Sequence, residues 1–311
     1  MVKHNHVVLP TLLLSFRKRM DEPFKFNFIH SFYKKRYELP KQVAAHSDVL
    51  FKAHEHSVIY NNTNIRLDDL SCSAHNDLDI VYSKTTYFDS MLTNRAMDYP
   101  FKESRIIREV YEPGPFLSSL RESKMSNHLG FNGFVELKDK SIIFVYRSSK
   151  VSIAKATWSS SVAASLKAAF ALNDEQQLTH VGLSEAIRCE IKNELKLDVP
   201  HDVDLSQSIF AFYRDLVEGG KPQFLFYTKL DSIENHKDFL NHFKKATSTK
   251  ASKKANEKTQ IIDGVKFQFF TLDQLKSFSY SLDHMKTPDG KIYKMTPSMI
   301  TSIVLLLKAT S

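Results

Sequence analysis

The chain has 311 residues, of which 42% are hydrophobic and 25% charged, with only 8 glycines and 10 prolines. This composition excludes collagen-like and low-complexity proteins and is typical of a globular chain with a sizeable core. The formal net charge of +8 suits a surface that attracts phosphate-bearing ligands, and it equally suits ordinary lysine-rich solubility.

Cysteine usage and hydropathy indicate a cytoplasmic protein. Cys72 and Cys189 are far apart and fit neither a disulfide framework nor a CxxC metal pattern. The longest apolar runs, near Val7–Leu14 and Ile303–Leu307, are shorter than the ~20 residues that a membrane helix needs. The N-terminus also lacks the order of charged, apolar and small residues that marks a secretory signal. We therefore expect no membrane partner.

Residues 1–112 are expected to form an N-terminal α+β domain. Its predicted strands are a buried run at Val7–Phe16 and shorter runs at Ser57–Tyr60, Ile65–Leu70 and Asp79–Tyr82. No familiar motif occurs there. The sequence leaves two roles open for this region, namely completing a ligand pocket or forming a homodimer.

The run Glu112-Pro-Gly-Pro115 predicts a turn or linker, and we place the domain boundary at 113–126. A second domain, 127–311, begins with a predicted hairpin of Phe131–Leu137 and Ser141–Arg147. The later pattern predicts helices at Leu183–Leu197, Asn235–Phe243 and Met299–Leu307, the last started by Thr296-Pro297, and strands at Ser208–Arg214, Gln223–Leu230 and Phe267–Phe270.

The helix predicted at Leu183–Leu197 carries two carboxylates beside its apolar face. At 100° per residue, Ile187 and Ile191 define that face, and Glu190 and Glu194 lie on or next to it, one turn apart. Ser184 is the predicted N-cap.

Two carboxylates in this position need a compensating charge, because burying an unpaired carboxylate costs several kcal/mol. One interpretation is that Glu190 and Glu194 bind Mg²⁺ or Mn²⁺ together with substrate phosphates, since oxygen ligands suit these ions. The other is that both carboxylates pair with Arg or Lys side chains from the packed sheet, or lie at its wet edge. Periodicity alone leaves both interpretations open.

The segment Cys189–Leu197 resembles the core of the Nudix signature, R-E-U-x-E-E-x-G-U, in which U is bulky and aliphatic. Glu190 and Glu194 match its first and last glutamates. Three positions depart from it: Cys189 replaces the arginine, Asn193 the middle glutamate and Lys196 the glycine. The order of strands and helices around the segment is also similar to that of the family.

The resemblance implies a Nudix-like α/β/α sandwich with a mixed sheet over 127–311. It implies a hydrolase of a nucleoside diphosphate linked to another moiety, with Glu190 and Glu194 as metal-binding and catalytic residues and Mg²⁺ or Mn²⁺ as cofactor. Arg147 would contact phosphate or cap the hairpin, and Trp158 would stack on a base or lie in the core. The alternative function is a weak or inactive Nudix-like module that binds a nucleotide or a partner.

Nucleic-acid binding would have to rest on the lysine-rich stretch Lys244–Lys258. This stretch has no interleaved aromatic residues and no recognition motif, and it is typical of a solvated loop. We therefore expect a nucleotide diphosphate derivative, not a nucleic acid, as the ligand.

Overall fold

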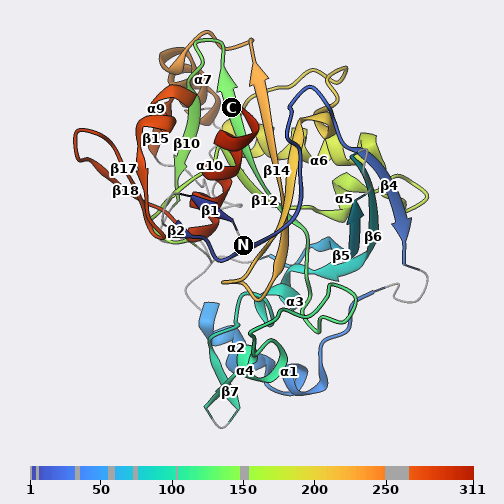
Figure 1. The fold of residues 1–311 in the computed structure, drawn as a ribbon. Helices are drawn as coiled ribbons and strands as arrows, with labels where there is room; N and C mark the ends of the chain where they lie inside the picture. Colours follow the sequence, from blue (N-terminus) through green and yellow to red (C-terminus); the bar gives the residue numbers. More distant parts are fainter. Residues whose placement is uncertain are drawn as a thin grey trace.

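The structure is a computed structural model that describes residues 2–4, 7–31, 36–54, 60–72, 76–102, 104–147, 154–248 and 266–311. It has a mixed α/β fold in which one large sheet forms the centre (Figure 1). The strand order of the sheet is β11 (Trp158–Ser159), β10 (Ile142–Tyr146), β9 (Gly130–Leu137), β14 (Lys221–Leu230), β13 (Ile209–Asp215) and β3 (Thr11–Phe16). Two further strands join it, β12 (Val162–Ser165) on β9 and β15 (Lys266–Phe270) on β10.

The sheet is mixed: β14 runs parallel to β9, and the other pairs of strands in the sheet are antiparallel. Consecutive strands β9 and β10 pair antiparallel, which confirms the predicted hairpin. The strands predicted at Ser208–Arg214, Gln223–Leu230 and Phe267–Phe270 are confirmed as β13, β14 and β15 within one or two residues at each end.

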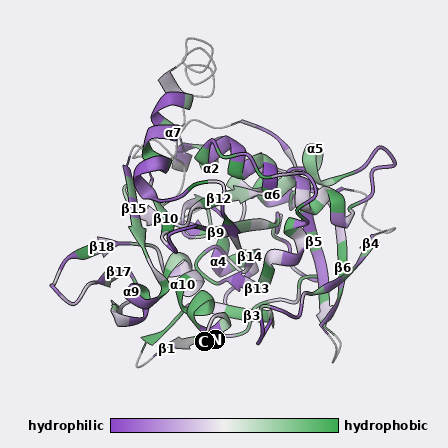
Figure 2. Ribbon diagram, turned by 90° about the horizontal axis from the view of Figure 1, so that it is seen from above, coloured by the Kyte–Doolittle hydropathy of each residue, from purple (hydrophilic) through white to green (hydrophobic). Residues whose placement is uncertain are grey.

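Two helices cover opposite faces of this sheet. Side chains alternate along each strand, so that Phe131 and Val135 of β9 join one core cluster and Phe134 joins another. Helix α6 (His180–Leu195) contributes apolar residues to the first cluster, and α10 (Pro297–Ala309) contributes to the second. Helix α10 is coloured as strongly hydrophobic in Figure 2, as expected for a helix buried over most of its length.

A three-stranded sheet packs on the α6 side of the molecule. It contains β4 (Lys25–His30), β6 (Asp77–Thr86) and β5 (Thr63–Cys72) in that order. Its apolar residues belong to the same core cluster as α6. The strands predicted at Ile65–Leu70 and Asp79–Tyr82 are confirmed within β5 and β6. Of the strand predicted at Ser57–Tyr60, residues 57–59 lie outside the described residues.

Short helices and strands below the two sheets form a third cluster, seen in the lower part of Figure 1. Its core includes Val43, Leu50, Leu92 and Ile107. The elements are α1 (Lys41–Ala45), α2 (Ser47–Phe51), η1 (Lys52–His54), α3 (Tyr87–Met91), β7 (Pro100–Lys102), β8 (Arg105–Ile106) and α4 (Ile107–Tyr111).

Strand β3 places the N-terminal part of the chain in the large sheet, where it pairs antiparallel with β13. The predicted run Val7–Phe16 is divided into β2 (Val7–Val8), which pairs with β1 (Lys3–His4), and β3. Pro10 lies between the two strands and has no N–H to give to a ladder.

The segment 113–126, predicted as a linker, packs against the rest of the protein. Leu120 and Met125 are buried, and the Ser118 carbonyl accepts a 2.6 Å hydrogen bond from the Arg214 guanidinium. Packing is therefore continuous across the proposed boundary, and the division into domains at this point stays a prediction.

The rest of the chain frames these layers. Helix α7 (His236–Ser248) confirms the helix predicted at Asn235–Phe243, and α10 confirms the start at Thr296-Pro297. Within the part of the chain that the structure describes, no helix combines the length and apolar character needed to cross a bilayer. The remaining elements are α5 (Ala168–Ala171), η2 (Leu205–Ser208), α9 (Leu272–Ser277), β16 (Ser279–Tyr280), β17 (His284–Lys286) and β18 (Ile292–Lys294).

Candidate functional site

Helix α6 begins three residues earlier than predicted. Thr179 is its N-cap, and the Thr179 hydroxyl accepts a 3.0 Å hydrogen bond from the Gly182 N–H. The predicted cap, Ser184, instead lies inside the helix, where its hydroxyl accepts a 2.8 Å bond from the Leu205 N–H. The expectation for Ser184 was wrong because a serine can satisfy a distant loop as well as its own helix end.

The helix ends at the position where the Nudix signature has glycine. Lys196 adopts the left-handed conformation there, with φ of +60°. Its carbonyl accepts a 2.8 Å bond from His242, and its ammonium donates to the Asn193 carbonyl at 2.7 Å. The helix terminus thus has the backbone geometry that favours glycine, while the sequence supplies a lysine.

Glu190 and Glu194 both face one cavity, as their spacing predicts. Glu190 is buried, and its carboxylate forms an ion pair with the Lys167 ammonium at 2.6 Å. The Glu194 carboxylate accepts a 3.1 Å hydrogen bond from the Ala163 N–H of β12. Of the two interpretations that the sequence left open, the structure shows charge pairing for Glu190, through a lysine between β12 and α5.

The other polar residues of this part of α6 do not point to a catalytic role. The Cys189 thiol donates to the Glu185 carboxylate at 3.3 Å, and burial raises the pKa of this thiol to about 11, which disfavours the nucleophilic thiolate. Asn193 is exposed. Arg188 is buried and donates to the carbonyl of Val203 at 2.7 Å, so it fastens the loop after the helix.

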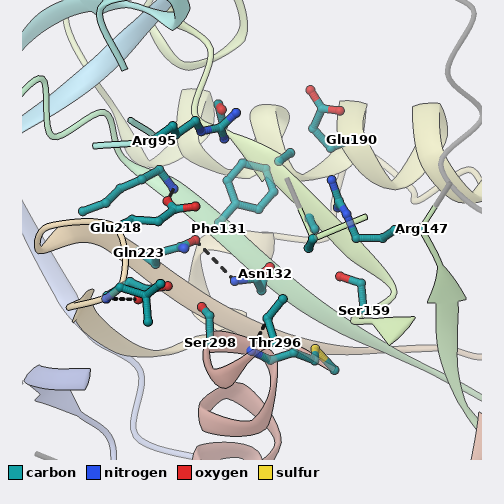
Figure 3. Close-up of a pocket in the computed structure, with 18 of the residues that line it drawn as sticks. Arg95, Phe131, Asn132, Arg147, Ser159, Glu190, Glu218, Gln223, Thr296 and Ser298 are labelled. Atoms are coloured by element: carbon teal, nitrogen blue, oxygen red, sulfur yellow. Dashed lines mark hydrogen bonds and ion pairs between the residues drawn. The ribbon is translucent and has the colours of Figure 1, made fainter. Parts of the chain in front are cut away.

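The cavity has a volume of about 500 Å³ and opens between α6, strands β9, β12 and β14, and the start of α10. In Figure 3, Glu190 and Arg147 lie on one side of it, while Arg95 and Glu218 lie on the other, with the Phe131 ring between them. The basic side chains in the lining are Arg95, Arg147, Lys167 and Lys221, and the acidic ones are Glu190, Glu194, Asp215 and Glu218.

Of the two residues predicted to contact the ligand, one lines the cavity and the other does not. Arg147 lines the cavity immediately after β10. Trp158 is not among the cavity-lining residues; its ring packs against Tyr146 and Tyr293, at centroid distances of 5.3 and 5.7 Å. Ser159, the next residue, lines the cavity in its place.

Across the cavity from Glu190 lie Glu218, which the sequence offers as a remote ligand, and three buried residues that were not anticipated. Asp215, Lys221 and Gln223 are 4%, 3% and 8% exposed, and they come from the paired ends of β13 and β14. The turn between these strands uses left-handed glycines, Gly219 and Gly220, at φ of +58° and +78°. The run of charged residues around Gly219-Gly220 was the one sequence feature that could have pointed to this group. The pairing register of β13 and β14, which the sequence does not give, is what places these residues at the cavity.

Residues before 113 complete this side of the cavity. Tyr87 and Arg95 line it directly. Asn94 donates to the Glu218 carbonyl at 2.9 Å, and Arg108 donates to the carbonyls of Leu216 and Val217 at 3.0 and 2.8 Å. Of the two roles left open for the N-terminal region, the structure therefore shows that it helps to build the pocket.

Burial and mutual repulsion shape the charges around Asp215. Burial, followed by repulsion from Glu218, raises the pKa of Asp215 to about 6, while the Lys221 ammonium opposes the shift. Burial likewise lowers the pKa of Lys221. Both shifts favour the neutral form of the group, because an ionised side chain is costly to remove from water.

The donor set does not fit a fully built divalent-metal site. Among the residues that the structure describes, no three His, Cys, Asp or Glu side chains gather in a way that could hold a metal ion. One of the two candidate carboxylates, Glu190, is already neutralised by Lys167. Mg²⁺ and Mn²⁺ favour several oxygen ligands and a negative site, so this arrangement is a poor match for them.

No family model matches this chain, and no curated protein matches it either. The Nudix resemblance therefore stays a prediction that rests on the helix motif and the order of elements. For the lysine-rich stretch, Lys244 and Lys245 lie in α7, whereas 249–258 lie outside the described residues.

Proposed function

We propose that the cavity binds a diphosphate linked to another moiety, such as a nucleotide derivative, and that the chain acts as a Nudix-like binding module and not as an efficient hydrolase. A mixed sheet between α6 and α10 supports the Nudix-like α/β/α arrangement. The cavity size, about 500 Å³, suits a ligand of nucleotide size.

The observation that carries the proposal is the ion pair between Lys167 and Glu190 inside the cavity. In the family that the helix resembles, a divalent ion would neutralise this glutamate. Here an ammonium group does so, with a nitrogen–oxygen distance of 2.6 Å. Asn193 adds no charge in place of the middle glutamate, so the site supports ligand binding better than metal-assisted chemistry.

Arg147 supplies a cation for the phosphates. It lies on the Glu190 side of the cavity in Figure 3, where its planar guanidinium can bond two phosphate oxygens at once. Lys167 adds a second positive charge on the same wall. Together these side chains offset the two carboxylates and make that side acceptable to an anionic ligand.

A Nudix-type hydrolase is the second candidate function, favoured by one observation. Glu190 and Glu194 both face the cavity from successive turns of α6, which is the placement that the signature requires. For hydrolysis, Lys167 would have to leave Glu190 so that the carboxylate could hold an ion.

The test is binding and turnover of ADP-ribose, measured by calorimetry and chromatography, with EDTA and with Mn²⁺. The binding module should bind ADP-ribose in EDTA and release no product in Mn²⁺, and Arg147→Met should weaken binding about tenfold through loss of charge-assisted bonds. Turnover in Mn²⁺ that disappears in Glu194→Gln would instead establish the hydrolase.

A further inference from the structure

The cavity has a second polar end, formed by Asp215, Glu218, Lys221 and Gln223. All four line the same cavity as Glu190, and Glu218 lies across it from Glu190 and Arg147 in Figure 3. Asp215, Lys221 and Gln223 are each more than nine-tenths buried. Building such a group of polar side chains into the protein is costly unless they hold a partner.

Several acceptors at this end have spare capacity. Glu218 Oε2 is buried and pairs with the Lys221 ammonium at 3.4 Å, and among the described residues it has no hydrogen-bond donor. From the part of the chain that the structure describes, Gln223 Oε1 accepts one long bond of 3.3 Å, donated by Asn132. Asp215 Oδ1 accepts the Val217 N–H at 2.9 Å. A ligand with O–H or N–H donors would satisfy what the protein leaves incomplete.

The chemistry of this end favours hydroxyl groups. A phosphate would meet two carboxylates, Asp215 and Glu218, and would be repelled by them. An apolar group would leave Glu218 Oε2 without a hydrogen-bond donor and would add nothing to the long bond of Gln223. A hydroxyl both donates and accepts, so it can bond to a carboxylate or amide oxygen and receive a bond from Lys221.

Gly130 keeps space open at this end. A Cβ atom at this position would lie 2.7 Å from the Lys221 ammonium and 2.9 Å from Gln223 Oε1. Any other residue would therefore push both polar groups out of place. Phe131, next along β9, also borders the cavity, with its ring buried in the core cluster and stacked on Phe224.

We propose that Asp215, Glu218, Lys221 and Gln223 bind the hydroxyl groups of a sugar ring that is linked to the diphosphate. The proposal rests on the proposed function, because it takes the Arg147 side of the cavity as the phosphate end. Two sources offer the same chemistry, namely the ribose of a nucleoside or a second sugar beyond the diphosphate.

The test is calorimetric binding, in EDTA, of inorganic diphosphate, ADP, 2′,3′-dideoxy-ADP and ADP-ribose to wild type, Asp215→Asn and Gln223→Leu. We expect wild type to bind ADP-ribose at least about tenfold more tightly than diphosphate, since each added hydrogen bond contributes about 1 kcal/mol. Each variant should lose about that factor for ADP-ribose and keep its affinity for diphosphate. Asp231→Asn, which removes an exposed aspartate, is the matched control and should change neither.

The four ligands separate the outcomes. A preference for ADP over its dideoxy form that the variants abolish assigns the nucleoside ribose, and a variant-sensitive gain seen only with ADP-ribose assigns the second sugar. Equal losses for ADP and dideoxy-ADP would overturn the proposal in favour of base contacts, as would unchanged ADP-ribose affinity in variants with normal thermal unfolding. If no ligand binds wild type at millimolar concentration, the proposed function itself fails.

Discussion

The ammonium nitrogen of Lys167 lies 2.6 Å from Glu190 Oε1, inside the cavity that also contains Arg147. The Glu190 side chain is 6% exposed and that of Lys167 is 29% exposed, so the carboxylate is the more deeply buried partner. A lysine thus neutralises the carboxylate that, by resemblance, would hold a divalent ion. The stability and the chemistry of the site both depend on this pair.

Replacing Lys167 by Met should destabilise the protein, because Glu190 would keep a buried charge without its partner. We expect the free energy of unfolding to fall by about 1–3 kcal/mol, measured by denaturant unfolding at neutral pH. The double variant Lys167→Met/Glu190→Gln removes both charges and should recover most of the loss. A double variant that is no more stable than Lys167→Met alone would show that the pair is not the cause.

Replacing Lys196 by Gly should stabilise the end of α6. Lys196 has a φ of +60°, and an L-residue with a side chain pays for this conformation while glycine does not. We expect the free energy of unfolding to rise by about 0.5–1 kcal/mol, since the larger entropy of glycine in the unfolded chain offsets part of the gain. Lys192→Gly, inside the same helix, should lower it by about 1 kcal/mol. Losses of equal size at both positions would contradict this account of the helix end.

Two glycines of β9 should respond differently to alanine. Gly130→Ala would displace Lys221 and Gln223, so it should weaken ADP-ribose binding while the protein still folds. At Gly133, a Cβ atom would lie 1.9 Å from the Phe226 ring in the core, so Gly133→Ala should lower the thermal midpoint instead. Thermal unfolding and calorimetry on both variants provide the comparison. Normal ADP-ribose affinity in Gly130→Ala would mean that this end of the cavity does not contact the ligand.

Asp215 should make stability depend on pH. Its pKa is raised from 3.8 to about 6 in the folded protein, so the neutral carboxyl is favoured there. The stabilisation from this shift is full below about pH 4 and is lost as the pH rises through about 6. Glu218 strengthens the effect and Lys221 opposes it. We therefore compare the free energy of unfolding of Asp215→Asn with that of wild type at two pH values. The difference, variant minus wild type, should be larger at about pH 7 than at about pH 4 by roughly 2 kcal/mol. Denaturant unfolding at the two pH values would show a constant difference if Asp215 is not responsible.

Local patterns predicted the elements on which the site is built. The 3.6-residue period identified α6 and placed Glu190 and Glu194 toward one cavity, and cap residues located the start of α10. These features depend on residues close together in the sequence, where spacing alone determines which side chains share a face.

Contacts between distant residues were beyond the reach of such patterns. Lys167 is 23 residues from Glu190, and nothing in its own neighbourhood indicates that it would pair with that carboxylate. Asp215 and Glu218 face the cavity because of the β13–β14 register, and Asn94 holds their turn from another part of the chain. Likewise, β3 joins the large sheet by pairing with β13, which lies far later in the sequence. Just after β3, the Arg17 guanidinium donates to the Ile209 carbonyl, a contact between residues 192 positions apart.

The most direct test of the account is calorimetric titration of Mn²⁺ into wild type and Lys167→Met, with Lys167→Met/Glu194→Gln as control. If Lys167 takes the place of a divalent ion, wild type should bind Mn²⁺ weakly, and Lys167→Met should bind it at least about tenfold more tightly, because Glu190 becomes available. The added Glu194→Gln change should remove that gain. Tight Mn²⁺ binding by wild type that Lys167→Met leaves unchanged would contradict the account and favour a working hydrolase site.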